Sequence, residues 1–206
     1  SNAVALSRPA YLTRLQQAGL TLLAASLHSW DAQVSDDVTR APGTHADTLA
    51  GIRAATAAGI RVALNVVVER RTLPGLPTLA RHIAAEFPRA VVSFSWPNVY
   101  HDAQQWRRFL APLHEIRAPL STAVAVLLDA GVQVTPLGPC GFPGCALEPA
   151  VARRTASDVT RFASQDRADR CYAPPCEACA LRPRCPGLRS TYVELYGTGD
   201  IAPVGA

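Results

Sequence analysis

Four of the six cysteines lie within fifteen residues near the end of the chain, at spacings of four, two and five residues. They are Cys171, Cys176, Cys179 and Cys185, in a segment too rich in Pro for regular helix or strand. The other two, Cys140 and Cys145, lie in a second loop rich in Pro and Gly. A Cys-x2-Cys turn lets two thiolates face one point, and soft thiolates gathered in this way suit zinc or an iron–sulfur cluster. Disulfides or unliganded thiols are the alternative.

The composition indicates one sizeable core, or one domain with an appendage. The chain has 206 residues, of which 49% are hydrophobic and 17% charged. It contains no Met and begins Ser1-Asn2-Ala3, which is typical of the scar left by cleavage of an affinity tag. We therefore expect residues 1–3 to be a tag remnant and the rest to be a fragment of a longer protein.

The charge pattern argues against several classes of partner. All twenty basic residues are Arg, the net charge is +4, and no basic stripe with interleaved aromatics occurs, so we expect no nucleic-acid partner. The apolar runs are too short to span a bilayer, so we expect no membrane partner. Clustered cysteines without a secretory signal predict a reducing, cytoplasmic compartment and metal ligation over disulfides.

Upstream of the cysteines, helical patterns alternate with short apolar runs. The predicted order is helix 8–18, strand 21–27, helix 44–58, strand 60–68, helix 76–87, strand 90–95, helices 103–114 and 119–130, and strand 132–135. Thr44 is the expected cap of the second helix, the polar segment 28–43 is expected to be irregular, and Pro119 is expected to separate two helices. Alternating strands and helices predict an α/β fold with a parallel sheet. About four strands make an open sheet or a partial (β/α) barrel, since a complete (β/α)8 ring needs more.

Beyond residue 135 the pattern changes. We place a boundary near residue 136, between an α/β unit at 4–136 and a cysteine-rich extension at 137–206 that has too few apolar residues to fold alone. Residues 188–197 are expected to form a short helix that ends at Gly197.

Several segments resemble radical S-adenosylmethionine (radical SAM) proteins. The pieces Ala18-Gly19-Leu20, Ala25-Ser26-Leu27-His28, Thr39-Arg40-Ala41-Pro42-Gly43-Thr44 and Gly51-Ile52 are similar to the fourth unit of that barrel, and residues 59–68 to its fifth strand. Cys176-x2-Cys179-x5-Cys185-Pro186-Gly187, with Tyr192 and Tyr196-Gly197 following, is similar to the SPASM and twitch extensions that bind auxiliary iron–sulfur clusters.

The resemblance implies an oxidoreductase or maturase whose barrel, related to the TIM barrel, holds a [4Fe-4S] cluster on a Cys-x3-Cys-x2-Cys motif. That cluster passes an electron to SAM, and the 5′-deoxyadenosyl radical then abstracts hydrogen from a substrate. The motif is absent from this sequence, so we do not expect the chain alone to cleave SAM. The implied partners are an electron donor such as flavodoxin or ferredoxin and an unidentified substrate, in some relatives a peptide or protein.

The resemblance also assigns an auxiliary [4Fe-4S] cluster to the tail, with zinc as a substitute. The full pattern has a fourth cysteine where this chain has Arg189. A fourth ligand would come from Cys171, Cys140 or Cys145, or the site would stay open for a substrate atom. The rival hypothesis is a binding module without catalysis, in which zinc on Cys176, Cys179, Cys185 and one more cysteine holds the tail together.

For SAM itself, the resemblance places Ser26 near the carboxylate, with Arg40 as its salt-bridging partner, Asn65 against SAM and His28 at the mouth of the site. A guanidinium fork matches a carboxylate, and an unpaired Asn65 amide inside an apolar strand would cost about 1–3 kcal/mol. The alternatives are a small packing residue at Ser26, a solvated charge at Arg40, a satisfied core amide at Asn65 and a surface histidine at His28. No His-Glu-x2-His motif, phosphate loop or nucleophile elbow is present, which argues against hydrolase and kinase functions.

Overall fold

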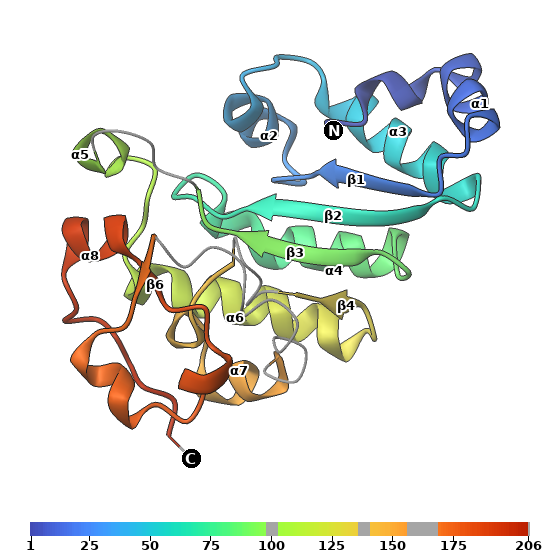
Figure 1. Cartoon of the computed structure of the whole chain (residues 1–206). Helices are drawn as coiled ribbons and strands as arrows, with labels where there is room; N and C mark the ends of the chain where they lie inside the picture. The colour runs from blue at the N-terminus through green and yellow to red at the C-terminus, as the bar shows by residue number, and fades with distance from the viewer. Residues whose placement is uncertain (98–102, 136–140, 156–168, 206) are drawn as a thin grey trace.

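The computed structural model describes residues 1–97, 103–135, 141–155 and 169–205 (Figure 1). The predicted α/β fold is confirmed, because four parallel strands form one sheet in the order β1-β2-β3-β4. These strands are β1 (Leu22–Ser26), β2 (Arg61–Val67), β3 (Val91–Ser95) and β4 (Gln133–Val134). A second sheet pairs two short antiparallel strands of the tail, β5 (Arg170–Cys171) and β6 (Leu188–Arg189).

Helices alternate with the strands along the chain, as the sequence predicts, with α2 as an additional helix. The longer ones are α1 (Pro9–Gln17), α3 (His45–Ala57), α4 (Leu76–Glu86) and α6 (Leu113–Asp129). The shorter ones are α2 (Ala32–Thr39), α5 (Ala103–Trp106), α7 (Pro149–Thr155) and α8 (Ser190–Tyr196). Single 3₁₀ turns are η1 (Val4–Ser7), η2 (Leu73–Gly75), η3 (Gly144–Ala146), η5 (Pro174–Ala178) and η6 (Arg182–Arg184).

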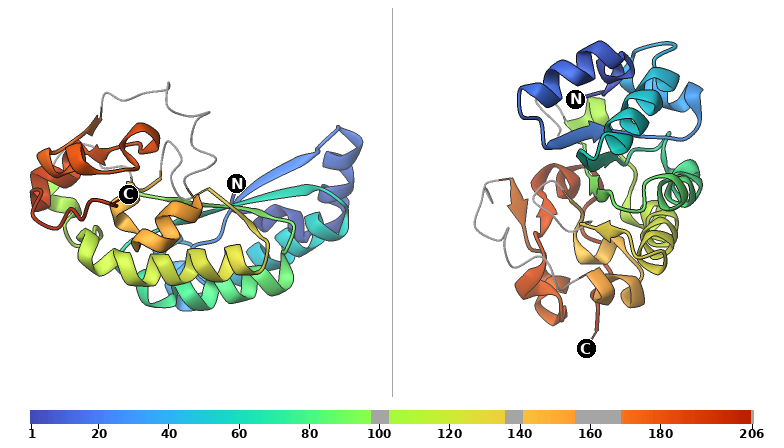
Figure 2. Two further views of the ribbon diagram at one scale, coloured as in Figure 1. Left: turned by 90° about the horizontal axis from the view of Figure 1, so that it is seen from below. Right: turned by 90° about the vertical axis from the view of Figure 1, so that its right-hand side faces the viewer.

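The two faces of the main sheet differ. Side chains alternate along each strand, and one set, which includes Leu64, Val66, Val92 and Phe94, is buried. Helices α3, α4 and α6 lie along that side of the sheet (Figure 2). The other set is half-buried or exposed, from Leu22 (48% exposed) to the row of polar residues at the strand ends. Parallel sheets normally have helices on both faces, so a face with no helix laid along it within the described ranges is the unusual feature of this fold.

The segment expected to be irregular contains a helix, α2. Asp31 is its N-cap, because its Oδ1 accepts a hydrogen bond from the Val34 amide at 2.9 Å. Thr44 occupies the predicted N-cap position of α3, but its hydroxyl donates to the Ala41 carbonyl and makes no capping hydrogen bond to the helix. Asp36 on α2 accepts from the His45 amide at 3.1 Å and so satisfies the start of α3. A long-range carboxylate thus does the work that the local sequence assigned to Thr44.

Pro119 does not separate two helices. It lies within α6, which runs without a break from Leu113 to Asp129, whereas the expected helix at 103–114 is only the single turn α5. A proline in a helix interior costs about 3 kcal/mol in isolation. Ile116, Leu120 and Val124 of α6 are buried, and this packing outweighs the lost hydrogen bond.

The first residues of the chain pair with the edge of the sheet. The Ser1 amino group donates to the Ala24 carbonyl at 3.0 Å, and the Ser1 carbonyl accepts from the Ser26 amide at 2.9 Å. This is the hydrogen-bond pattern of a parallel ladder. Gly51 allows η1 to lie close to α3, because a Cβ at this position would be 2.1 Å from the Ala3 carbonyl oxygen.

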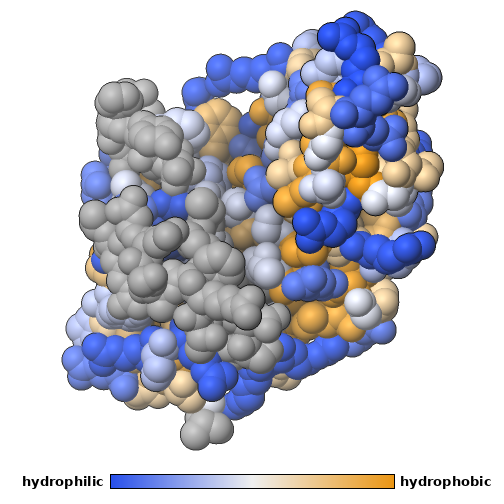
Figure 3. Space-filling model, turned by 45° about the vertical axis from the view of Figure 1, so that its right-hand side comes forward, coloured by the Kyte–Doolittle hydropathy of each residue, from blue (hydrophilic) through white to orange (hydrophobic). Residues whose placement is uncertain are grey.

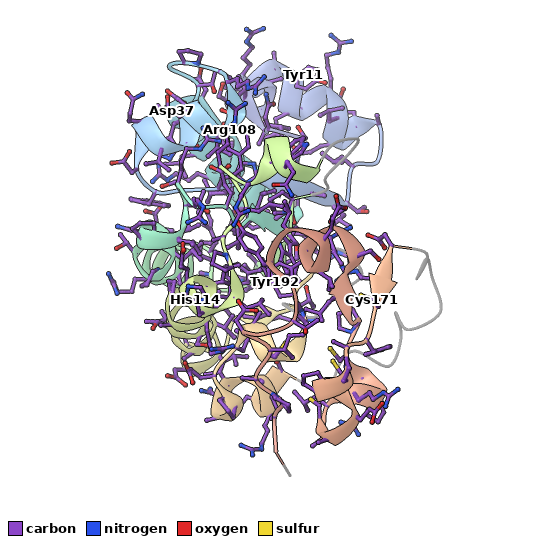
Figure 4. The ribbon with its side chains drawn as sticks, turned by 90° about the vertical axis from the view of Figure 1, so that its left-hand side faces the viewer. Tyr11, Asp37, Arg108, His114, Cys171 and Tyr192 are labelled. Atoms are coloured by element: carbon purple, nitrogen blue, oxygen red, sulfur yellow. The ribbon has the colours of Figure 1, made fainter. Side chains whose placement is uncertain are left out.

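The tail packs onto the carboxyl end of the sheet and shares its core. Trp96, just beyond β3, is buried; it stacks on Phe142 at 5.0 Å and contacts Tyr192 of α8 at 4.9 Å between ring centroids. Figure 4 shows Tyr192 in the middle of the molecule, between His114 of α6 and Cys171 of the tail. None of the helices in the described ranges has the length and apolar character needed to cross a lipid bilayer.

Candidate functional site

A row of small polar side chains crosses three strands at the carboxyl end of the sheet. Ser26 of β1 is the register partner of Asn65 of β2, and Asn65 is the partner of Ser93 of β3. Ser95 lies two residues further along the same face, and all four side chains are half-buried. The row therefore lies on the face along which none of the described helices is laid, at the strand ends where parallel α/β proteins build their sites. Figure 3 shows apolar surface on the right-hand part of the molecule in that view, with hydrophilic residues among it.

The hydrogen bonds of the row fix how Asn65 is oriented. Its Oδ1 accepts from the Ser95 hydroxyl at 2.5 Å and from the Ser93 hydroxyl at 3.1 Å. With both hydroxyls on the oxygen, the amide nitrogen Nδ2 lies at the other corner of the group, as a donor with no recorded acceptor among the described residues. The two hydroxyls hold the Asn65 oxygen on the β3 side. The Asn65 amide nitrogen is therefore left as a donor toward Ser26, its register partner on β1.

His28 lies just past β1 and is buried (9% exposed). Its Nδ1 accepts a hydrogen bond from the Val67 amide at 3.1 Å, so the ring extends the pairing of β1 with β2 beyond the last strand residue. Burial lowers the pKa of His28 from 6.5 to about 4, so the ring is neutral at neutral pH. This contact gives His28 a structural task, and contact with a ligand at the mouth stays a prediction.

Arg40 ends α2 in the left-handed conformation, with φ 54°, and is exposed. No hydrogen bond or ion pair joins it to Ser26, His28 or Asn65. The structure therefore places Ser26 and Asn65 side by side in the sheet and His28 just beyond the end of β1. Arg40 makes no polar contact with these three residues.

In the tail, four cysteines line one small cavity, which we call the cysteine cavity. They are Cys145, Cys176, Cys179 and Cys185. Cys145 belongs to η3, Cys176 to η5, and Cys179 and Cys185 end η5 and η6 respectively. Four apolar residues also line this cavity: Pro143, Leu188, Ile201 and Pro203.

Backbone donors surround the sulfur of Cys185. The amides of Gly144 and Gly187 each donate to its Sγ at 3.4 Å. Amides directed at a sulfur favour the thiolate form, as at many metal sites. Gly187 has φ +81°, and a Cβ there would be 2.9 Å from the Cys171 carbonyl oxygen, so only glycine brings this amide into place.

Burial opposes ionisation of the same sulfurs when no cation is near. Burial, followed by the neighbouring Cys185 and Cys176 thiols, raises the pKa of Cys145 to about 12. Burial also raises the pKa of Cys185, against the two amide hydrogen bonds. Cys145 and Cys185 are thus close enough to the other cavity sulfurs to be influenced by them, and these two thiols stay protonated unless a cation joins them.

The other two cysteines are not in this group. Cys171 lies on β5, paired with Leu188 of β6, and does not line the cavity. Cys140 lies outside the described residues. All five described cysteines are free thiols.

The fit to a metal can be judged from the space between the sulfurs. The cysteine cavity has a free volume of about 20 Å³, room for about one water molecule or one metal ion. An iron–sulfur cubane adds four sulfides to four irons and needs several times that space. Within the described ranges, no three His, Cys, Asp or Glu side chains already stand close enough to hold an ion. The donor chemistry therefore fits a soft metal, the volume fits a single ion, and the sulfurs must turn inward to bind it.

Sequence reasoning missed two parts of these sites. Ser93 could have been found, because small polar residues alternate with Val92 and Phe94 along β3, a pattern typical of a strand with one open face. The aromatic cover of the cavity had no such signal: the Tyr172 hydroxyl donates to the Cys185 carbonyl at 2.7 Å, and Arg182 lies over the Tyr172 ring at 5.5 Å. Asn98 and His101, which follow β3 in the sequence, lie outside the described residues.

Comparison with known proteins adds little to this geometry. No family model matches the chain, and no curated protein sequence matches it. Among solved structures, the chain is similar to a domain of a pyruvate-formate lyase-activating enzyme from Bacteroides vulgatus, with 19% identity over 63% of this chain and 74% of that one. The TM-score is 0.48, a level at which the likeness carries no conclusion about function.

Proposed function

We propose that this chain is part of a radical SAM oxidoreductase, in which the sheet forms one wall of the SAM and substrate cavity. The observation that carries the proposal is the row of Ser26, Asn65, Ser93 and Ser95 at the carboxyl edge of a sheet face that no helix of the described ranges covers. The sequence resemblance to that family motivates the choice of ligand.

The residues of the row fit a carboxylate-bearing ligand. Ser93 and Ser95 hold the Asn65 oxygen, so the Asn65 nitrogen and the Ser26 hydroxyl are the groups that can donate to a carboxylate such as that of SAM. Bound SAM would supply the radical chemistry, and it needs a reduced [4Fe-4S] cluster for which this sequence has no Cys-x3-Cys-x2-Cys motif. The part of the chain described here would bind and orient the ligand, and we do not expect it to cleave SAM by itself.

The tail would complete the protein with a thiolate metal centre. The family resemblance makes this an auxiliary iron–sulfur cluster that relays electrons or binds substrate. A second candidate is the zinc-stapled module without catalysis, and the free volume of about 20 Å³ favours it. Iron and sulfide content after anaerobic reconstitution, compared with zinc content, separates the two. The proposed partners remain an electron donor such as flavodoxin or ferredoxin and a peptide or protein substrate.

The test of the SAM wall is Asn65→Asp. Aspartate keeps an oxygen for the Ser93 and Ser95 hydroxyls but replaces the donor by a second negative oxygen, which repels a carboxylate. We expect the wild-type chain to bind SAM in isothermal titration calorimetry and the variant to bind at least tenfold more weakly, with an unchanged melting temperature.

The control is Gln17→Glu, which makes the same amide-to-carboxylate change on the exposed end of α1. It should bind SAM like the wild type. Absence of SAM binding by the wild-type chain, or equal binding by the Asn65→Asp variant, would refute the proposal for the sheet face.

A further inference from the structure

We infer that the cysteine cavity holds a single tetrahedral metal ion, best matched by Zn²⁺, with Cys145 as the fourth ligand, and not the [4Fe-4S] cluster that the family resemblance implies. The inference refines the metal centre of the proposed function and does not depend on SAM binding.

The first argument is the identity of the fourth cysteine. Three candidates were open from the sequence, and Cys145 alone of the two described ones lines the cavity with Cys176, Cys179 and Cys185. Cys171 instead lies in the β5–β6 pairing, with its carbonyl oxygen close to Gly187. Cys145 lies more than thirty positions before Cys176, the first of the other three cavity cysteines. A shared ion would therefore join the loop after β4 to residues 176–185.

The second argument is the donor set and the size of the site. Four cysteines and the apolar side chains of Pro143, Leu188, Ile201 and Pro203 line a free volume of about 20 Å³, which suits a single ion once the sulfurs turn inward. A closed tetrahedral set of four cysteines is typical of structural zinc, whereas catalytic zinc keeps one exchangeable position. Zn²⁺ has no geometric preference from its d electrons, so four sulfurs at the corners of a tetrahedron can satisfy it.

The third argument is the support around the ligands. Gly144 and Gly187 donate to the Cys185 sulfur, and Nε of Arg117 on α6 donates to the Cys145 carbonyl at 3.1 Å. Such contacts orient metal ligands and offset the negative charge of four thiolates on one dication. Arg182 lines the same cavity and adds a second positive charge. Residues from α6, from η3 and from 176–187 therefore converge on the cysteine cavity.

The test uses the whole chain, purified without oxygen, stripped with a chelator and titrated with Zn²⁺ or Co²⁺. We expect one ion per chain by elemental analysis, and with Co²⁺ the intense visible bands of tetrahedral thiolate coordination. Cys145→Ser should weaken the affinity by at least tenfold and change the Co²⁺ spectrum, as should Cys176→Ser, whose side chain is less buried. The matched control Cys171→Ser should bind Co²⁺ like the wild type.

Three results would overturn the inference. One is loss of the ion in Cys171→Ser with full retention in Cys145→Ser. Another is four irons and four sulfides per wild-type chain after reconstitution with iron and sulfide. The third is no stoichiometric binding of Zn²⁺ or Co²⁺. Far-UV circular dichroism of Cys176→Ser guards against a mere folding defect, because a folded variant with weakened binding still supports the ligand set.

The outcome is separable from that of the proposed function. A chain that binds one zinc but no SAM would uphold the metal inference and refute the SAM wall. A chain that binds SAM but no metal would uphold the SAM wall and refute the metal inference.

Discussion

At the scale of single residues, Asn65 and His28 show how polar side chains in or next to apolar strands have their hydrogen bonds satisfied. Each has a partner from a neighbouring strand: Ser93 and Ser95 hydroxyls for the Asn65 oxygen, and the Val67 amide for His28 Nδ1. A buried polar group without such a partner costs about 1–3 kcal/mol. The sequence could show that these residues were out of place, but not which partners would satisfy them, because the partners lie about 30 to 40 positions away.

His28 also makes stability depend on pH. Its folded-state pKa of about 4 lies below the ordinary value of 6.5, so the unfolded chain binds the proton first as pH falls. The stabilisation that the neutral ring gives the folded state is fully present above about pH 6.5 and is lost progressively as the pH falls toward 4. The whole loss in the free energy of unfolding is about 3 kcal/mol. His28→Asn keeps an acceptor for the Val67 amide and removes the titration.

We expect urea unfolding to show a smaller loss of stability between pH 6.5 and 4.5 in His28→Asn than in the wild type. An identical pH slope in the two proteins would contradict the assignment of this titration to His28. Carboxylates titrate in both proteins, so the difference between the two curves isolates the histidine.

At the scale of elements, the strands were the most predictable part. β1, β2 and β3 are short, nearly continuous apolar runs, and each appears within two residues of its expected bounds. The errors concern helices whose ends depend on distant groups. Asp36 of α2 satisfies the start of α3, and packing carries α6 through Pro119. Local propensity contains neither piece of information.

Helix α8 joins the tail to α6 through one hydroxyl. Tyr192 is buried, its hydroxyl accepts from the Leu113 amide at 3.0 Å and donates to the Asp200 Oδ2 at 2.6 Å. Burial, and then this bond to Asp200, raises the pKa of Tyr192, so the hydroxyl stays protonated and able to donate. The contact satisfies the first amide of α6, which has no partner inside the helix.

Tyr192→Phe should therefore reduce the free energy of unfolding by about 1–3 kcal/mol, since it leaves the Leu113 amide and a mostly buried carboxylate without this partner. Tyr11→Phe is the matched control, because Tyr11 is 42% exposed on α1. Chemical denaturation of both variants measures the difference. Equal stabilities would mean that water replaces the hydroxyl at no cost.

At the scale of the whole molecule, the cysteine-rich tail is not a separate layer. Phe142, Leu188, Tyr192 and Val204 belong to the same buried cluster as the strands. The expectation that residues 137–206 cannot fold alone stays a prediction, and this shared core is its physical reason. Which cysteines would meet could not be read from spacing, because the approach of η3 to η5 and η6 depends on how α6 and the tail pack.

Metal removal should consequently loosen the tail and leave the sheet intact. We expect hydrogen exchange to rise on chelation in residues 141–147 and 173–185, with no change in β1, β2 and β3, since the ion would join only the first two segments. Mass spectrometry of exchanged peptides measures this. If the exchange rates of residues 141–147 and 173–185 in the wild type are the same with and without the chelator, the cavity cysteines carry no structural ion.

The pairing of Ser1 with β1 has a practical consequence for anyone who attaches a probe or a carrier protein to this chain. An acylated or fused Ser1 keeps one N–H that can donate to the Ala24 carbonyl, but the attached group begins at the sheet edge. At the opposite end Gly205 is exposed, and its carbonyl accepts a hydrogen bond from Arg153 at 3.0 Å, so a carrier attached after it leaves the edge of the main sheet untouched.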